Sequence, residues 1–349
     1  MMWEGYCLKG LRADKPDIEW HEVHEKPFSI HGLLCKDALT RMSDEDSSKV
    51  SPAVHAGSAS PAGGRIRFAT DSPYIAIKAD VSAYDNGSPH VTRLANTGFD
   101  IYVSDGVRQQ YCGSFYPPID CEEYVEGIKD VGCDGIREFT VNLPLARAVK
   151  ALHIGIKKGS VLKEHSEYRH PVPVAFYGSS ITQGFAASRP GTAYESFISR
   201  KYDCDYYNFG YSGHCRGELA MADFLGRLDI SLLVLDYDHN APDTDNLKAT
   251  HEPFFKRFRE LKPDLPVIMV TKPDGRLLGA DRDRRSVIMN TYLNAKSLGD
   301  ENVYFIDGYS FFPDDVRFDC TVDGCHPNDL GMYMIADKIG AVIGHLLGK

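Results

Sequence analysis

Short segments in which apolar and polar residues alternate recur through the first 170 positions of the chain. The clearest are RIRFATD (65–71), YIAIKADV (74–81), FDIYVSD (99–105), REFTVNL (137–143) and KALHIGIKKG (150–159). A period of two is typical of strands that bury one face and expose the other. Several such strands separated by turn-forming residues predict an antiparallel β-sandwich. Residues 36–62 are polar and rich in small side chains, and we interpret them as a long loop of this domain.

A different pattern begins near His170. Nearly continuous apolar runs occupy residues 171–177, 204–210, 231–237, 265–271 and 302–308. Such runs are typical of strands buried on both faces, as in a parallel sheet. Between and after them, apolar residues recur with helical spacing in residues 191–202, 216–228, 246–262, 284–299 and 328–347. This alternation predicts an α/β fold with three α/β/α layers and about five parallel strands. The predicted domains are therefore 1–170 and 171–349.

Length, charge and cysteine usage narrow the function classes. A chain of 349 residues exceeds the roughly 250–300 that one core usually serves, which favours two domains. The formal net charge of −10 argues against a nucleic-acid partner or an anionic membrane surface. We find no signal peptide and no apolar stretch approaching the ~18–20 residues of a membrane span. Nine scattered cysteines without a CxxC pair favour a reduced, cytoplasmic protein. A monomer and a homo-oligomer are both compatible with the sequence.

The first strand of the second domain ends in Gly178-Ser-Ser-Ile-Thr-Gln-Gly184. Ligands of parallel α/β sheets bind at the carboxyl ends of the strands, so this segment is a candidate site. A phosphate-binding loop would need a lysine after its second glycine, and the sequence continues instead with Phe185. The GxSxG turn of α/β-hydrolases would need glycine at position 182, where threonine stands. From the residues alone, a glycine-serine turn that caps the next helix remains an alternative.

Three more segments place polar residues at comparable points. The second strand ends in Asn208-Phe-Gly-Tyr-Ser-Gly-His214, and Asn240 follows the third strand. Each could be an ordinary turn. Before the last helix, Asp323 precedes His326 by three residues. A carboxylate at that spacing can accept the Nδ1 proton of the imidazole and leave Nε2 free to deprotonate a serine.

Taken together, these segments resemble the SGNH (GDSL-type) hydrolase family, whose catalytic domain is flavodoxin-like. The resemblance covers essentially all of 171–349 and preserves the order of the family's blocks. The first 170 residues are similar to the jelly-roll module that precedes the catalytic domain in some carbohydrate esterases of this family. That second likeness depends on strand patterning and not on motifs.

The resemblance implies a role for each candidate residue. Ser180 matches the nucleophile, His326 the general base and Asp323 the acid that orients it. The oxyanion hole would consist of the backbone N–H groups of Ser180 and Gly213 and the side-chain amide of Asn240. This chemistry needs no cofactor and no metal. Cys320 and Cys325 lie close to His326, but a zinc site would need a second ligand pair, so we expect no metal there.

Two of the family's blocks depart from the usual pattern. Ser179 stands where the family usually has an aspartate before the nucleophile. The Gly-x-Asn-Asp block appears as Asp238-His-Asn-Ala241, without its glycine or the acid after the asparagine. Neither departure removes a proposed catalytic group. Both concern how the loops around those groups are positioned.

By analogy with the family, the expected function is a serine esterase that hydrolyses short-chain (acetyl) esters of a carbohydrate, with a small molecule or an oligosaccharide as the substrate. The same triad would also serve a lysophospholipase, a thioesterase or an acyltransferase. From another class, the chain could be a non-catalytic carbohydrate-binding protein on a hydrolase scaffold. In the first domain, Tyr111, Phe115 and Tyr116 could stack on a sugar or fill the core. Arg189, just after the nucleophile block, could contact a polar substrate or be an exposed loop charge.

Overall fold

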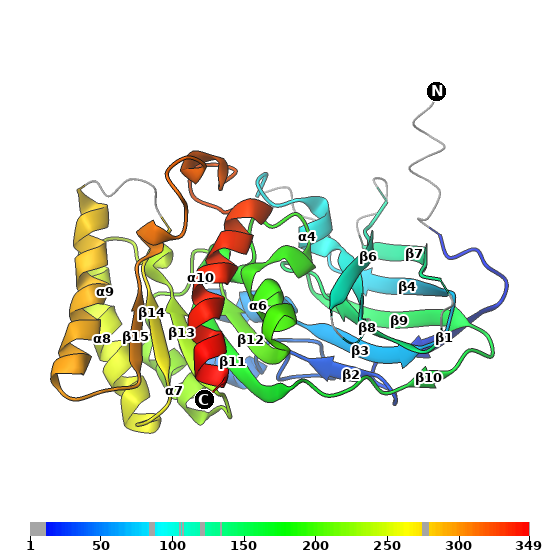
Figure 1. Cartoon of the computed structure of the whole chain (residues 1–349), viewed down its shortest axis with the longest axis horizontal. Helices are drawn as coiled ribbons and strands as arrows, with labels where there is room; N and C mark the ends of the chain where they lie inside the picture. Colours follow the sequence, from blue (N-terminus) through cyan, green and yellow to red (C-terminus); the bar gives the residue numbers. More distant parts are fainter. Residues whose placement is uncertain are drawn as a thin grey trace. The chain divides into compact units, whose positions relative to one another are not determined.

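A computed structural model of the chain describes residues 12–83, 88–104, 106, 108–118, 123–132, 135–273 and 279–348. These residues form two compact units (Figure 1). The first comprises the described residues up to Arg41 together with Ala59–Glu167 and Ser188–Gly191. The second comprises Met42–Ser58, Tyr168–Ala187 and the residues from Thr192 onward. The two units therefore follow the two sequence patterns, with two exceptions. Met42–Ser58 belongs to the second unit and Ser188–Gly191 to the first.

The first unit consists of two antiparallel sheets. One has the order β1 (Ile18–Glu22), β9 (Val149–Lys157), β4 (Tyr74–Val81), β7 (Tyr124–Asp130). The other has the order β10 (Leu162–Lys163), β3 (Arg65–Thr70), β8 (Arg137–Asn142), β5 (Phe99–Ser104), β6 (Gln109–Phe115), and β2 (Ser29–His31) also pairs with β3. The helix α4 (Arg93–Thr97) precedes β5.

The alternating apolar residues of both sheets meet in one core. Ile77 and Ile154 from the first sheet belong to the same buried cluster as Phe68 and Phe139 from the second. Phe68 and Phe139 are paired across β3 and β8, and their rings stack with centroids 5.7 Å apart. The predicted β-sandwich is confirmed, because period-two alternation directs one face of each strand into this cluster.

The second unit is built on a parallel sheet. Its order is β12 (Cys204–Gly210), β11 (His170–Gly178), β13 (Leu232–Asp236), β14 (Val267–Val270), β15 (Val303–Ile306). Its longer helices are α6 (Tyr194–Tyr202), α7 (Leu219–Arg227), α8 (Thr244–Leu261), α9 (Ala280–Ser297) and α10 (Asp329–Leu347). Helices α6 and α10 pack against each other, and α7, α8 and α9 pack in sequence. The predicted α/β/α domain with five parallel strands is confirmed.

The expectation of a long loop over residues 36–62 was wrong for its central part. Residues Asp44–Val50 form α2 and Pro52–Ser58 form α3. Ser43 caps α2 by accepting a hydrogen bond from the backbone N–H of Asp46 at 3.0 Å, and three acidic residues occupy the first turn. Both features are ordinary helix-start signals. The two helices belong to the second unit, where Asp46 forms an ion pair of 2.6 Å with Arg227 of α7.

Helix α10 bears on the expectation that the chain contains no membrane span. By length and composition alone, Asp329–Leu347 would pass as a membrane span, although the sequence patterns indicated none. In this structure Ile335, Ile339 and Ile343 are buried, and Tyr333 packs its ring against Phe197 of α6. A core helix passes the same test of composition.

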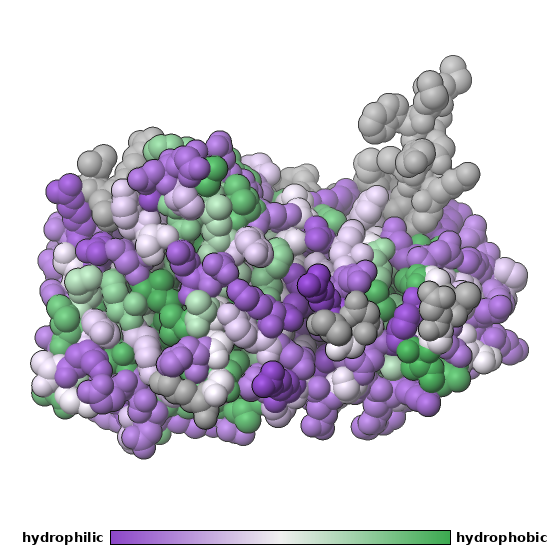
Figure 2. All heavy atoms as spheres, viewed as in Figure 1, coloured by the Kyte–Doolittle hydropathy of each residue, from purple (hydrophilic) through white to green (hydrophobic). Residues whose placement is uncertain are grey.

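The face of the molecule drawn in Figure 2 is mostly hydrophilic, with hydrophobic residues scattered over it.

Candidate active site

The register of the parallel sheet brings three of the sequence segments to one edge. Gly178 at the end of β11 lies opposite Gly210 of β12 on one side and Asp236 of β13 on the other. The residues that follow these three strands therefore leave the sheet side by side. This is the edge at which parallel α/β sheets bind ligands.

Ser180 lies at the start of a single helical turn, α5 (Ser180–Gln183). Ser179 caps this turn, since its hydroxyl accepts the Ile181 N–H at 3.1 Å. Gly184 ends the turn with a φ of +104°, a left-handed conformation that favours glycine. At Gly178 a Cβ atom would lie 2.0 Å from Thr182 Oγ1, so a glycine is needed there as well. The serine at position 179 can therefore serve as the cap that the family's usual aspartate would provide.

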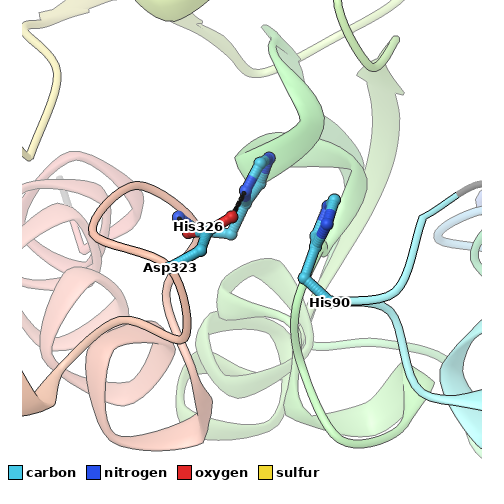
Figure 3. Close-up of side chains that lie close together, drawn as sticks. All are labelled: His90, Asp323 and His326. Carbon is cyan, nitrogen blue, oxygen red and sulfur yellow. Dashed lines mark hydrogen bonds and ion pairs between the residues drawn. The ribbon is translucent and has the colours of Figure 1, made fainter.

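The structure places Ser180, His326 and Asp323 in one chain of hydrogen bonds. Ser180 Oγ lies 2.9 Å from His326 Nε2, and His326 Nδ1 lies 2.7 Å from Asp323 Oδ2. The other carboxylate oxygen of Asp323 accepts the backbone N–H groups of Cys325 and His326 at 3.0 and 2.7 Å. Figure 3 shows Asp323 and His326 on one loop, with the imidazole directed at the carboxylate.

The hydrogen bonds around Asp323 fix its charge. Partial burial acts to raise the pKa of its carboxyl, but the N–H donors of His326 and Cys325 outweigh burial and lower the pKa to about 2. Asp323 is thus ionised at every pH at which an imidazole can act as a base. An ionised partner on Nδ1 keeps the proton there and leaves Nε2 as the acceptor for the serine proton.

The two other predicted oxyanion donors also lie together. Gly213, at a φ of +74°, directs its N–H to Asn240 Oδ1 at 3.2 Å. Asn240 Nδ2 donates one hydrogen to the carbonyl of Tyr211 at 2.8 Å. Since an amide nitrogen carries two hydrogens, its second N–H is the one that could donate to an oxyanion. Ser180 N opens α5, where backbone N–H groups have no partner within the helix.

Two family models match the chain. Residues 171–344 match the model of the GDSL-like lipase/acylhydrolase family. Residues 18–162 match the GxDLY family, described as the N-terminus of SGNH hydrolase-type esterases, and Gly98-Phe-Asp100-Ile-Tyr102 follows that motif with isoleucine in place of leucine. The chain belongs to the SGNH (GDSL-like) hydrolase family. It is accordingly a carboxylic ester hydrolase.

Solved structures of similar proteins have the same fold. A protein described as a GDSL-like lipase from Bacteroides ovatus is 26% identical, with a TM-score of 0.86 over 95% of this chain and 98% of its own. The salicylyl-acyltransferase SsfX3 of a tetracycline biosynthetic pathway is 18% identical, with a TM-score of 0.77 over 96% and 100%. A family two carbohydrate esterase from Clostridium thermocellum is 15% identical, with a TM-score of 0.59 over 82% and 93%. Among curated proteins, none matches by sequence.

Arg189 of this SGNH hydrolase lies in the β-sandwich unit. Its Nε is 3.4 Å from Asp100 Oδ2, and its guanidinium lies over the Tyr111 ring, 4.2 Å from the ring centroid. Asp100 is fully buried and also accepts the backbone N–H of Gly191 at 2.8 Å. Within its unit, Arg189 therefore neutralises the buried acid of the GxDLY motif. Its role toward substrate stays a prediction.

The aromatic candidates divide between core and surface. Phe115 is buried in the sandwich core, whereas Tyr111 and Tyr116 are exposed.

In the catalytic unit, Cys320 Sγ contacts the carbonyl of Val316, and Cys325 Sγ lies 3.7 Å from His239 Nδ1. These two described thiols thus have different partners and do not converge on one ligand set.

Sequence reasoning missed the polar residues that support the nucleophile turn. Asp236 is buried, and its Oδ2 accepts hydrogen bonds from Thr182 Oγ1 at 3.1 Å and Tyr194 Oη at 3.4 Å. Its backbone carbonyl accepts the Ser179 N–H at 3.2 Å. The only available signal was an aspartate at the end of an apolar run, which is also the pattern of an ordinary turn.

The pKa of Asp236 predicts how stability depends on pH. Burial raises this pKa to about 7, against the opposing effect of the hydroxyl donors. Between pH ~4, where the carboxyl ionises in the unfolded chain, and pH ~7, the folded state keeps a proton that the unfolded state loses. This group therefore makes the folded state less stable as pH rises through that interval.

We expect Asp236→Asn to remove this dependence. The melting temperature of the variant, relative to the natural protein, should be higher by a few degrees at pH 8 than at pH 4.5. Thermal unfolding at both pH values measures the difference, with the exposed Asp315→Asn as the matched control. An equal difference at the two pH values would contradict the assignment of Asp236.

Proposed function

We propose that this SGNH hydrolase is a serine esterase in which Ser180, His326 and Asp323 form the catalytic triad. The observation that carries the proposal is the hydrogen-bond chain from Ser180 Oγ through the imidazole to Asp323. His326 Nε2 takes the proton of Ser180 as Oγ attacks the ester carbonyl, and Asp323 stabilises the resulting imidazolium. His326 then gives that proton to the departing alcohol, which leaves an acyl group on Ser180. Water repeats the sequence and releases the carboxylic acid.

The negative charge that develops on the carbonyl oxygen needs donors in place before the reaction. We assign this role to the N–H groups of Ser180 and Gly213 and to the Asn240 amide. The Gly213 N–H, which donates to Asn240 Oδ1 in this structure, turns to the oxyanion when the substrate binds. Gln183 supports the arrangement, because its Oε1 accepts the Ser212 N–H at 2.9 Å and so joins the nucleophile turn to the segment that contains Gly213. Removing one donor of this kind typically costs ~2.7–4 kcal/mol of transition-state stabilisation.

For the substrate, we propose an acetyl or similarly short acyl ester of a carbohydrate. Within the catalytic unit, a cavity of about 530 Å³ lies beside the Asp323 loop. Its lining mixes aromatic and polar groups, among them Phe312, Arg317, Phe318, Thr321 and Asp323. Phe318 is 70% exposed and offers a ring face, while the hydroxyl and charged groups suit a polyol better than a long acyl chain. Family two carbohydrate esterases share the fold of this chain.

Replacing the nucleophile tests the reaction class. Ser180→Ala should lower kcat/KM for p-nitrophenyl acetate by at least 10³-fold, since a triad without its nucleophile keeps only the contribution of the remaining groups. A fluorophosphonate probe should label the natural protein and not the variant. Ser297→Ala, an exposed serine of α9, is the control and should retain activity and labelling. Wild-type rates in Ser180→Ala would reject the triad, and absence of labelling in the natural protein would favour a non-catalytic binding protein.

Replacing Asp323 tests whether this acid orients the imidazole of His326. In Asp323→Asn the amide can donate to His326 Nδ1 and so favours the tautomer whose Nε2 carries the proton. We expect kcat to fall by roughly 10³–10⁴-fold with little change in KM. Steady-state kinetics measure this, and circular dichroism checks the fold. A loss of less than tenfold would mean that Asp323 does not orient the base.

The acyl preference is tested with a series of p-nitrophenyl esters from C2 to C12 together with acetylated xylose and glucosamine. We expect kcat/KM to decline steadily beyond C4 and the acetylated sugars to be hydrolysed. A maximum at C8 or longer would replace the carbohydrate proposal with a lysophospholipase or thioesterase. Transfer of the acyl group from Ser180 to an added alcohol in preference to water would identify an acyltransferase.

A further inference from the structure

The turn that carries Asn240 contains a buried ion pair. Asn240 ends a short 3-10 turn, Asp238–Asn240, that follows β13. Asp238 stands where the family pattern has glycine, and its side chain is almost completely buried against Arg284 of α9. Arg284 Nε donates to Asp238 Oδ1 at 2.9 Å. A buried ion pair is costly to desolvate, and such pairs contribute little net stability.

The guanidinium of Arg284 also binds the backbone on both sides of Asn240. Its Nη2 donates to the carbonyl of Asp238 and, at 3.2 Å, to the carbonyl of Ala241. A single planar group thus binds the Asp238–His239 peptide unit before Asn240 and the Ala241–Pro242 peptide unit after it. Lysine could not copy this arrangement, because only the guanidinium offers several donors in a rigid fork.

Asp238 ties the same turn to the neighbouring strand. Its second oxygen accepts the Lys272 backbone N–H at 3.0 Å, just after β14 ends. The turn is therefore held from α9 and from β14 at once. The direction of the Asn240 amide depends on this backbone. Among the described residues, the amide itself forms hydrogen bonds with Gly213 and Tyr211.

We propose that Arg284, through its pairing with Asp238, is a positioning residue that holds Asn240 in the oxyanion hole. The inference rests on the proposed function, in which Asn240 is an oxyanion donor. It also accounts for the departure at position 238: the carboxylate that replaces the family's glycine is the anchor for a guanidinium that fixes the turn. Arg284 itself touches no reacting atom.

The first test compares two adjacent arginines of α9. Arg284→Ala should lower kcat for p-nitrophenyl acetate by roughly 10- to 100-fold, less than the loss of a donor, with KM changed by no more than about twofold. Arg285→Ala is the matched control, because Arg285 forms a comparable two-bonded ion pair with Asp307, at 2.6 and 3.0 Å, away from this turn. Its kcat should stay within about twofold of the natural value. Equal losses of kcat in the two variants would overturn the proposal.

A double-mutant cycle separates positioning from general destabilisation. If Arg284 acts through Asn240, its removal has nothing left to disturb once that amide is gone. The double variant Arg284→Ala/Asn240→Ala should then be as slow as Asn240→Ala alone. Rate losses that simply multiply would show that Arg284 acts elsewhere.

Chemical rescue covers the case in which Arg284→Ala is poorly stable. Arg284 lines a cavity of about 390 Å³, so a small cation can reach the space left by its side chain. Guanidinium chloride at tens of millimolar should restore at least tenfold of the lost kcat in Arg284→Ala and none in Asn240→Ala. Sodium chloride and urea are the controls for charge and for shape. Failure of rescue in a variant that is folded by circular dichroism would count against the proposal.

The outcomes distinguish this inference from the function on which it rests. If Ser180→Ala and Asn240→Ala abolish or greatly slow hydrolysis while Arg284→Ala does not, the esterase proposal stands and the positioning role fails. If Asn240→Ala retains full activity, the oxyanion assignment and the positioning role fail together. If Ser180→Ala retains activity, the triad itself is wrong.

Discussion

The hydrogen bond between Ser180 Oγ and His326 Nε2 joins residues that are 146 positions apart in the sequence, and the catalytic unit is organised around it. Ser180 is fixed by a strand end and a single capped turn. His326 is fixed by a loop that closes on itself, with Val322 N–H donating to the His326 carbonyl at 2.9 Å. The two segments are also joined directly, because Ala186 N–H donates to the carbonyl of Pro327 at 3.2 Å. A short contact between two side chains is thus held by backbone hydrogen bonds.

Keeping that geometry requires polar groups to be buried beneath it. Asp236 lies below the nucleophile turn, and burial raises its pKa to about 7. Burial also raises the pKa of Glu195 in α6 well above its usual range. Asp238 and Arg284 form the corresponding pair below the Asn240 turn. Buried polar groups of this kind reduce stability but permit few alternative arrangements of the loops above them.

The sequence was informative where one local pattern decides the structure. Continuous apolar runs predicted the parallel sheet. The three polar segments at strand ends and the loop before the last helix predicted the residues that meet at its edge. The sequence was less informative where tertiary contacts decide which segments form strands or helices and which side chains are buried. The strand β6 was not predicted, since a register shift between Ile101 and Tyr102 of its partner and a glycine at position 113 break its alternation. Helices α2 and α3 are short and polar, and they are assigned to the second unit by contacts such as that of Ser58 Oγ with Tyr211 Oη at 3.1 Å. Arg284 is one of several charged residues on α9, and only the folded structure shows which of them is buried.

The most direct test of the central claim is to find the acyl group during turnover. The natural protein is mixed rapidly with p-nitrophenyl acetate, quenched with acid, digested and mapped by mass spectrometry. We expect one acetyl group on the peptide that contains Ser180, at that residue, and none there in Ser180→Ala. Acylation of Cys325, the thiol next to His326, or hydrolysis with no acylated residue at any time point, would contradict it.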